Sequence, residues 1–122
     1  MARILFVDDD PFTLETLTKA VQVLGHYALI AATGEEALRV ASKEAPDLIF
    51  TDMMLTDMNG LTLVGLLKEN VPTQPIPVIM LSASPVLDAV ERARAAGAKE
   101  YFNKPIRLQE LLDIIQKYTS DK

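Results

Sequence analysis

Cysteine is absent from the 122 residues, which excludes disulfide frameworks, thiolate zinc sites, iron–sulfur clusters and cysteine nucleophiles. Positive charge is scarce: 12 Lys and Arg against 17 Asp and Glu give a formal charge of −5, which argues against a nucleic-acid-binding surface. No apolar run approaches the roughly 18 residues of a membrane span, and no signal-peptide pattern opens the chain. We therefore expect a cytoplasmic protein that binds neither membranes nor nucleic acids directly.

Short apolar runs alternate with longer stretches of helical period, and Gly, Pro, Asn and Asp separate them. This alternation predicts an α/β fold in which helices cover both faces of a parallel sheet. Five strands are expected: Arg3–Val7, Tyr27–Ala31, Asp47–Thr51, Val78–Leu81 and Lys99–Phe102. The first, third and fourth are continuous apolar runs, typical of central strands, and the other two suit the sheet edges. We expect a single domain over residues 1–122, with a core over 2–118 and a polar tail over 119–122.

Capping patterns and apolar stripes predict five helices between these strands. Asp10-Pro11 and Ser84-Pro85 each supply an N-cap followed by proline at the first helical position, and the second pair predicts a helix over residues 85–96. Thr33-Gly34-Glu35-Glu36 is a capping-box pattern that opens another helix. Leucine-rich stripes of helical spacing predict a helix over 60–69 and a last helix that includes residues 108–115.

Polar side chains directly follow four of the expected strands. Asp8-Asp9-Asp10 follow the first strand, Asp52 the third, Ser82 the fourth and Asn103-Lys104-Pro105 the fifth. Because ligands bind outside the carboxyl ends of parallel strands, these groups are expected to form one site. Clustered carboxylates call for a cation, and an all-oxygen set favours Mg²⁺, with Mn²⁺ as a substitute. An aspartate beside such an ion, a lysine and a hydroxyl group suits a nucleophile for phosphoryl transfer.

Four stretches of the chain resemble the receiver domain of two-component response regulators, in the order and spacing of that family. They are residues 4–10 (ILFVDDD), 52–60 (DMMLTDMNG), 78–83 (VIMLSA) and 97–105 (GAKEYFNKP). The resemblance covers residues 2–118. It implies a doubly wound, flavodoxin-like three-layer (βα)5 fold with strand order 2-1-3-4-5, and a signalling phosphoacceptor in place of a conventional enzyme.

The resemblance implies roles for the acidic residues. Asp52 would accept the phosphoryl group from a phosphohistidine donor. Asp9 would bind Mg²⁺ directly and Asp8 through water, while Asp52 and the main-chain carbonyl of Met54 would complete the protein ligands. Asp10 is expected to be a helix cap.

The resemblance also implies a switch around the phosphoryl group. Lys104 would pair with the phosphoryl group, and the Lys104–Pro105 peptide would be cis, an arrangement that needs proline. Ser82 would move to donate a hydrogen bond to the phosphate, and Tyr101 would respond by changing rotamer. The output surface would lie within residues 85–118.

The partners implied by the resemblance are a sensor histidine kinase or histidine phosphotransfer protein, and an effector domain or protein at the 85–118 face; a homodimer stays open.

The sequence departs from the family pattern at Thr56, where proline is usual, so the loop after the acceptor is expected to be less rigid than in relatives. Ile106 replaces a common phenylalanine. Lys99-Glu100 replaces an acidic pair found in one large class of DNA-binding regulators.

Two alternative functions fit parts of the same pattern. A receiver-like docking module would use the fold without phosphorylation. A small Asp-x-Asp phosphohydrolase would use Asp8 as nucleophile and Asp10 as general acid, but it leaves Asp52 and Lys104 partly unexplained.

Overall fold

The computed structural model describes residues 1–83 and 88–120, and within them five parallel strands form one sheet of order β2-β1-β3-β4-β5. The strands are β1 (Arg3–Val7), β2 (Tyr27–Ala31), β3 (Leu48–Asp52), β4 (Val78–Ser82) and β5 (Glu100–Asn103). The expected fold class and strand order are confirmed, with β1, β3 and β4 at the centre and β2 and β5 at the edges.

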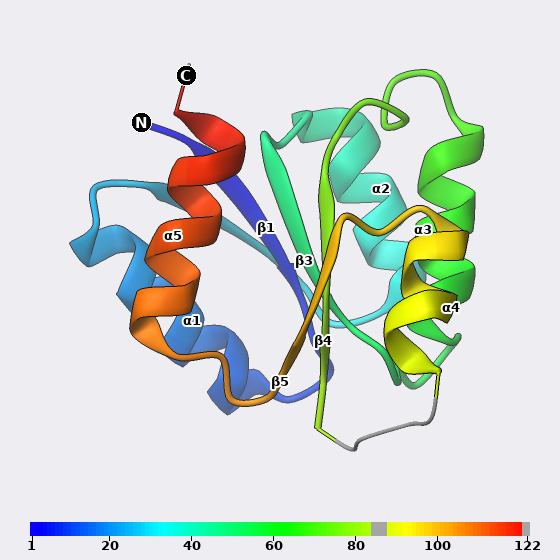
Figure 1. The fold of residues 1–122 in the computed structure, drawn as a ribbon. Coiled ribbons are helices and arrows are strands. Elements are labelled where there is room, and N and C mark those ends of the chain that lie inside the picture. The colour runs from blue at the N-terminus through cyan, green and yellow to red at the C-terminus, as the bar shows by residue number, and fades with distance from the viewer. Residues whose placement is uncertain (84–87, 121–122) are drawn as a thin grey trace.

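Helices cover both faces of the sheet, as the alternation predicts (Figure 1). In the described part of the chain they are α1 (Pro11–Val23), α2 (Gly34–Glu44), α3 (Gly60–Glu69), α4 (Ala89–Ala96) and α5 (Leu108–Thr119). Helices α1 and α5 lie on one face, and α2, α3 and α4 lie on the other. None of the helices in the described ranges is both long and apolar enough to cross a membrane.

The strand ladders extend further toward the carboxyl edge than the apolar runs suggest. Asp52 ends β3 and pairs with Leu81, and Ser82 ends β4 and pairs with Asn103. A ladder continues while the neighbouring backbone offers partners, whatever the polarity of the side chain. Strands β3 and β5 accordingly begin and end one residue later than predicted. The polar residues at this edge are therefore held by the sheet itself.

The described part of helix α4 begins at Ala89, directly after Asp88, whose backbone is left-handed (φ 66°). The predicted Ser84-Pro85 start lies outside the described residues. At the other end of the described residues, α5 ends at Thr119, whose hydroxyl donates to the Ile115 carbonyl at 2.5 Å.

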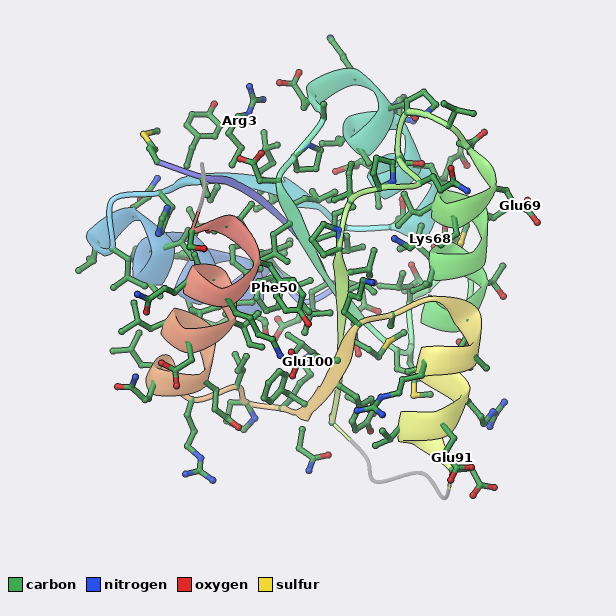
Figure 2. All side chains as sticks on the ribbon, turned by 45° about the horizontal axis from the view of Figure 1, so that its top comes forward. Arg3, Phe50, Lys68, Glu69, Glu91 and Glu100 are labelled. Atoms are coloured by element: carbon green, nitrogen blue, oxygen red, sulfur yellow. The ribbon has the colours of Figure 1, made fainter. Side chains whose placement is uncertain are left out.

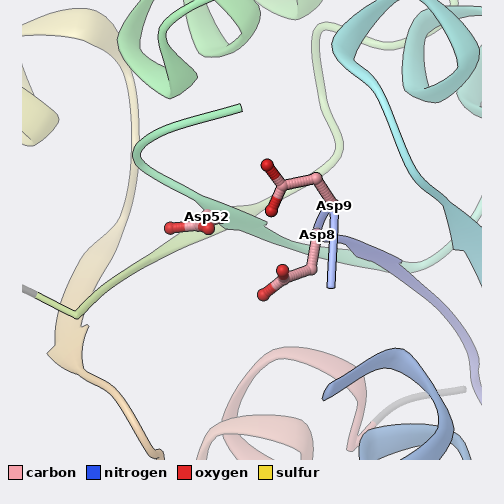
Figure 3. Close-up of side chains that lie close together, drawn as sticks. All are labelled: Asp8, Asp9 and Asp52. Atoms are coloured by element: carbon pink, nitrogen blue, oxygen red, sulfur yellow. The ribbon is translucent and has the colours of Figure 1, made fainter. Parts of the chain in front are cut away.

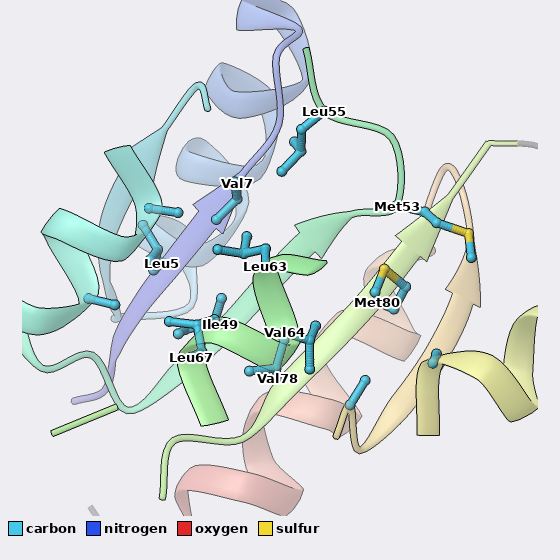
Figure 4. Close-up of a cluster of buried hydrophobic side chains, with 14 of the residues drawn as sticks. Leu5, Val7, Ile49, Met53, Leu55, Leu63, Val64, Leu67, Val78 and Met80 are labelled. Carbon is cyan, nitrogen blue, oxygen red and sulfur yellow. The ribbon is translucent and has the colours of Figure 1, made fainter. Parts of the chain in front are cut away.

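Two apolar clusters sandwich the sheet. Alternate side chains of β1 show the division, because Leu5 and Val7 join the α2–α3–α4 cluster, while Ile4 and Phe6 join the α1–α5 cluster. Figure 4 shows the first cluster, which packs the central strands against α3. In the second, Phe50 lies between the sheet and α5 (Figure 2), with its ring stacked on Phe6 at 5.3 Å. Burial on both faces explains why the central strands are continuous apolar runs.

Candidate functional site

Three carboxylates converge at the carboxyl edge of the sheet. Asp8 and Asp9 follow β1, and Asp52 is the last residue of the neighbouring β3. One oxygen from each of the three side chains lies within 4.8 Å of the other two (Figure 3). Asp8 is only 3% exposed, whereas Asp9 is open to solvent. The edge therefore presents an acidic pocket in which the Asp8 side is buried and the Asp9 side is open to solvent.

Lys104 enters the pocket from the segment after β5. Its ammonium donates to Asp8 Oδ2 at 2.5 Å and to Asp52 Oδ2 at 3.3 Å. The Lys104 backbone N–H donates to the Ser82 carbonyl at 2.7 Å, and the Lys104–Pro105 peptide is cis, as the resemblance implies. One ammonium thus bridges the carboxylates that end two adjacent strands.

Burial and charge set the electrostatics of this group. Burial raises the pKa of Asp52, and the neighbouring Asp8 charge adds to that rise, while Lys104 offsets part of it. Burial alone would lower the pKa of Lys104. The hydrogen bond to Asp8 and the charge of Asp52 outweigh burial, so the pKa of Lys104 lies above its ordinary range. Lys104 is therefore a permanent cation at neutral pH.

The donor set fits a hard divalent cation. Three carboxylates stand against one ammonium, which leaves negative charge that a second cation would neutralise. All the candidate side-chain donors are oxygens, the ligands that Mg²⁺ and Mn²⁺ prefer. Asp10 lies outside this set, because its carboxylate accepts from Phe12 N–H and from the Thr13 hydroxyl at the start of α1. That cap was expected, and the Thr13 hydrogen bond lowers the pKa of Asp10.

Three further residues were predicted to belong to the site. Ser82 is buried at the end of β4, and Met54 has an exposed side chain two residues after Asp52. The Met54 N–H donates to Asp52 Oδ1 at 3.4 Å. Tyr101 lies on β5 and packs against the α2–α3–α4 cluster. Its buried hydroxyl has no hydrogen-bond partner among residues 1–83 and 88–120.

The loop between β3 and α3 contains contacts that sequence reasoning missed. Gly60 approaches β3 so closely that a Cβ there would lie 2.3 Å from the Asp52 carbonyl oxygen, so only glycine fits. The Asp57 carboxylate accepts from the N–H groups of Gly34 and Glu35 at the start of α2. The Asn59-Gly60 pair was a readable signal for the first contact. The second joins residues more than 20 positions apart and leaves no local pattern.

Comparison with known proteins agrees with this arrangement. The family model described as "Response regulator receiver domain" matches residues 4–116. Protein PilH of Pseudomonas aeruginosa is 32% identical over 115 residues, which cover 94% of this chain and 95% of PilH. Chemotaxis protein CheY4 of Vibrio cholerae has a similar structure, with a TM-score of 0.90 at 28% identity over 97% of this chain and 98% of that one.

A third similar structure is the receiver domain of sensor histidine kinase PA1611 from Pseudomonas aeruginosa, with a TM-score of 0.87 at 26% identity over 96% of each chain. That structure has a magnesium ion coordinated in its active-site cleft. Fold and acidic edge together define a doubly wound α/β protein with a pocket suited to a divalent cation. The chain belongs to the receiver domain family of two-component response regulators.

Proposed function

We propose that this receiver domain is a phosphoryl switch in which Asp52 accepts the phosphoryl group. The observation that carries the proposal is the convergence at one sheet edge of Asp52, two further carboxylates and the Lys104 ammonium. Asp52 is fixed by the β3 ladder and remains accessible from the open side of the pocket. Family membership supports the same function, because receiver domains generally act as signalling phosphoacceptors.

In this proposal Asp8, Asp9, Asp52 and the main-chain carbonyl of Met54 hold Mg²⁺, which Mn²⁺ can replace. The bound ion would neutralise the charge that builds up where phosphoryl oxygens approach the carboxylates. The relative that holds magnesium in its cleft supports this part of the proposal.

The residues of the chain supply the rest of the chemistry. An oxygen of the Asp52 carboxylate forms a bond to phosphorus while the P–N bond of a phosphohistidine donor breaks, and the electron pair leaves with the imidazole nitrogen. Lys104, already 3.3 Å from Asp52, would pair with the transferred phosphoryl oxygens. Hydrolysis of the resulting acyl phosphate returns Asp52 to its carboxylate and resets the switch.

The phosphoryl group would then act on Ser82 and Tyr101. It adds about two negative charges at pH 7 and new acceptor oxygens beside Ser82, whose hydroxyl would donate to it. The buried Tyr101 hydroxyl lacks a partner in the described structure, so its present rotamer carries a cost that another rotamer would relieve. The two residues lie on the adjacent strands β4 and β5. We propose that their movement changes the α4–β5–α5 surface, where an effector would bind.

The phosphohydrolase alternative is weakened by Asp10. A general acid needs a raised pKa, but the Thr13 hydroxyl lowers the pKa of Asp10 and its carboxylate caps α1. The docking-module alternative makes no use of the acidic pocket. Phosphoryl labelling of the protein would contradict that alternative.

The test is intact-protein mass spectrometry after incubation with acetyl phosphate and Mg²⁺. We expect one added phosphoryl group on the natural protein, and none on Asp52→Asn or without a divalent cation. Labelling of Asp52→Asn at the same site would overturn the role of Asp52. No labelling with any donor would favour the docking module, and continuous turnover of a phosphate ester would favour the hydrolase.

The stability of Asp52→Asn provides the folding control. Burial raises the pKa of Asp52, so the native state binds its proton more tightly than the unfolded chain does. Ionised Asp52 therefore lowers stability as pH rises from about 4 through the native pKa. Without Mg²⁺ we expect Asp52→Asn to raise the free energy of unfolding at pH 7 by on the order of 1 kcal/mol. That gain should vanish in urea denaturation at about pH 3.

A protein donor must contact the rim of the pocket to bring its phosphohistidine to Asp52. A groove of about 380 Å³ runs between α1 and the segment after β5 and reaches Lys104; its lining includes Phe12, Leu17 and Ile106. Phe12 is 74% exposed there. We propose a sensor histidine kinase or phosphotransfer protein as the occupant. Phe12→Ala should slow transfer from a phosphohistidine protein but leave labelling by acetyl phosphate unchanged; equal slowing with both donors would contradict this surface.

A further inference from the structure

The loop that follows Asp52 is hydrogen-bonded to α2 through the Asp57 side chain. Asp57 Oδ1 accepts from the Gly34 N–H at 2.8 Å, and Oδ2 accepts from the Glu35 N–H at 3.0 Å. Both donors belong to the first turn of α2, where backbone N–H groups lack helical partners. These bonds lower the pKa of Asp57, so its carboxylate stays ionised at neutral pH.

Other hydrogen bonds join the base of the loop to β4 and to itself, and the Met53 N–H donates to the Leu81 carbonyl at 2.9 Å. The Gly60 N–H donates to the Met53 carbonyl at 2.6 Å, and the Leu55 N–H donates to the Met58 carbonyl at 3.2 Å. The Asn59 side chain caps its own helix α3. These contacts hold the base of the loop, whereas the Asp57 hydrogen bonds join its tip to α2. Among the described residues, Asp57 makes the side-chain hydrogen bonds that join this loop to α2.

Packing reinforces the same junction. The Met58 side chain lies against Gly34 so closely that a Cβ there would be 2.5 Å from the Met58 sulfur. The loop therefore meets α2 at two adjacent points, one polar and one apolar. Residue 56 at the tip is threonine, so the tip lacks the backbone restraint that a proline would give.

We propose that Asp57 is a positioning residue for the divalent-cation site, because its tie to α2 holds the loop that carries the Met54 carbonyl. The proposal rests on the proposed function, in which that carbonyl is a metal ligand. A main-chain carbonyl has no rotamer with which to adjust its direction. Its direction depends on the backbone of Met54 and Leu55, and ligand atoms must be held within about 0.5 Å to bind well.

A purely structural role for Asp57 makes a different prediction. A carboxylate at the start of a helix stabilises that helix through its N–H groups and its dipole. If Asp57 did only this, its loss would lower thermal stability and leave the cation affinity of the folded protein unchanged. The two roles are therefore separated by measuring affinity and stability on the same variants.

The experiment is isothermal titration of the metal-free full chain with MgCl₂ at constant ionic strength. We expect Asp57→Ala to raise the Mg²⁺ dissociation constant about tenfold, the lower end of what loss of an outer-shell contact costs. Asp57→Asn keeps one acceptor oxygen without the charge, so we expect it to give an intermediate dissociation constant.

Two control variants separate the effects of Asp57→Ala, which are the loss of a helix cap and the loss of a negative charge. Thr33→Ala removes the other α2 cap, in which the Thr33 hydroxyl oxygen accepts from the Glu36 N–H, without touching the loop. It should lower the melting temperature and leave the dissociation constant unchanged. Glu35→Gln removes one exposed negative charge beside Asp57 and keeps the tie, so it should change the dissociation constant by less than about twofold at physiological salt.

A readout without metal completes the test. In Asp57→Ala the amides of Met54 and Leu55 should exchange with deuterium faster than in the natural protein, whereas Thr33→Ala should leave them unchanged. Unchanged affinity and exchange in Asp57→Ala would overturn the positioning role alone. A natural protein that fails to bind Mg²⁺ would overturn the proposed metal site, and this inference with it.

Discussion

Helices α4 and α5 cover opposite faces of the sheet next to the edge strand β5, yet they are held in different ways. Helix α5 buries Leu111, Ile114 and Ile115 in the α1–α5 cluster. Helix α4 buries only the alanines Ala89 and Ala93 in the α2–α3–α4 cluster. Because the hydrophobic contribution scales with buried apolar area, α5 is held much more strongly than α4.

Polar contacts widen the difference. Glu100 on β5 accepts from Lys117 at 2.8 Å and from the Tyr118 hydroxyl at 2.7 Å, so α5 is tied to the edge strand. No ion pair ties α4 to its neighbours within residues 1–83 and 88–120. Its N-cap Asp88 makes no capping hydrogen bond, and Glu91 points away from the sheet (Figure 2).

The weaker attachment of α4 makes it the helix that can shift at the lower free-energy cost. The described part of α4 begins toward the edge of the sheet where β3 ends with Asp52 and β4 with Ser82 (Figure 1). Elements that rearrange come from the least stable parts of a fold. We therefore expect α4 to be the moving part of the output surface and α5 the fixed part.

The largest expected effect is on α5. Ile115→Ala removes a side chain that is 2% exposed and should lower the free energy of unfolding by about 2–5 kcal/mol. Ala93→Gly is the matched change on α4. It removes one buried methyl group and adds backbone freedom, so we expect a loss of about 1–2 kcal/mol. Urea denaturation at pH 7 measures both, and an equal or larger loss for Ala93→Gly would break the comparison.

A smaller effect is expected on the local unfolding of α4 and α5. Native-state hydrogen exchange should show the amides of Ala93–Ala96 exchanging on the order of tenfold faster than those of Ile114–Lys117. Ala93→Gly should accelerate exchange in α4 without changing it in α5, because an opening of α4 leaves the α1–α5 cluster intact. If both helices exchanged at one common rate, they would open as a single unit and α4 would have no independent freedom.

Most of the fold could be predicted because buried segments consist of apolar residues, which form recognisable patterns in the sequence. The central strands β1, β3 and β4 are apolar on both faces, so their runs are continuous and easily found. The left-handed backbone at Asp88 could not be predicted in this way, because it depends on the path of the chain and not on local propensity.

The site could be predicted as far as strand ends determine it. Parallel strands bring Asp8, Asp9 and Asp52 to one edge, and the segment after β5 brings Lys104 to them. The Asp57 contact with α2 escaped prediction because its partners precede it by 22 and 23 residues. The Tyr101 hydroxyl, which has no hydrogen-bond partner in the part of the chain that the structure describes, escaped prediction as well, since its environment depends on how the side chain packs.

The smallest expected effect concerns the tie between β5 and α5. Burial of Glu100 raises its pKa, but the hydrogen bonds from Lys117 and Tyr118 outweigh burial and the pKa is lowered overall. A lowered native pKa means that the tie is fully present above the unfolded pKa of about 4.3 and is lost as pH falls through the native value. Glu100→Gln should therefore lower the free energy of unfolding by about 0.5–1 kcal/mol at pH 7.

The pH dependence distinguishes this tie from packing. The difference between the natural protein and Glu100→Gln should shrink as pH falls from about 4.3 through the lowered native pKa of Glu100, because below that pKa both proteins carry a neutral group at position 100. Lys117→Met is the matched control, since it removes the cation and keeps the aliphatic contact; it should show the same pH dependence with a smaller amplitude, because the Tyr118 hydrogen bond remains. A difference that stayed constant down to pH 3 would assign the effect to side-chain packing, and the polar part of the contrast between α4 and α5 would fall away.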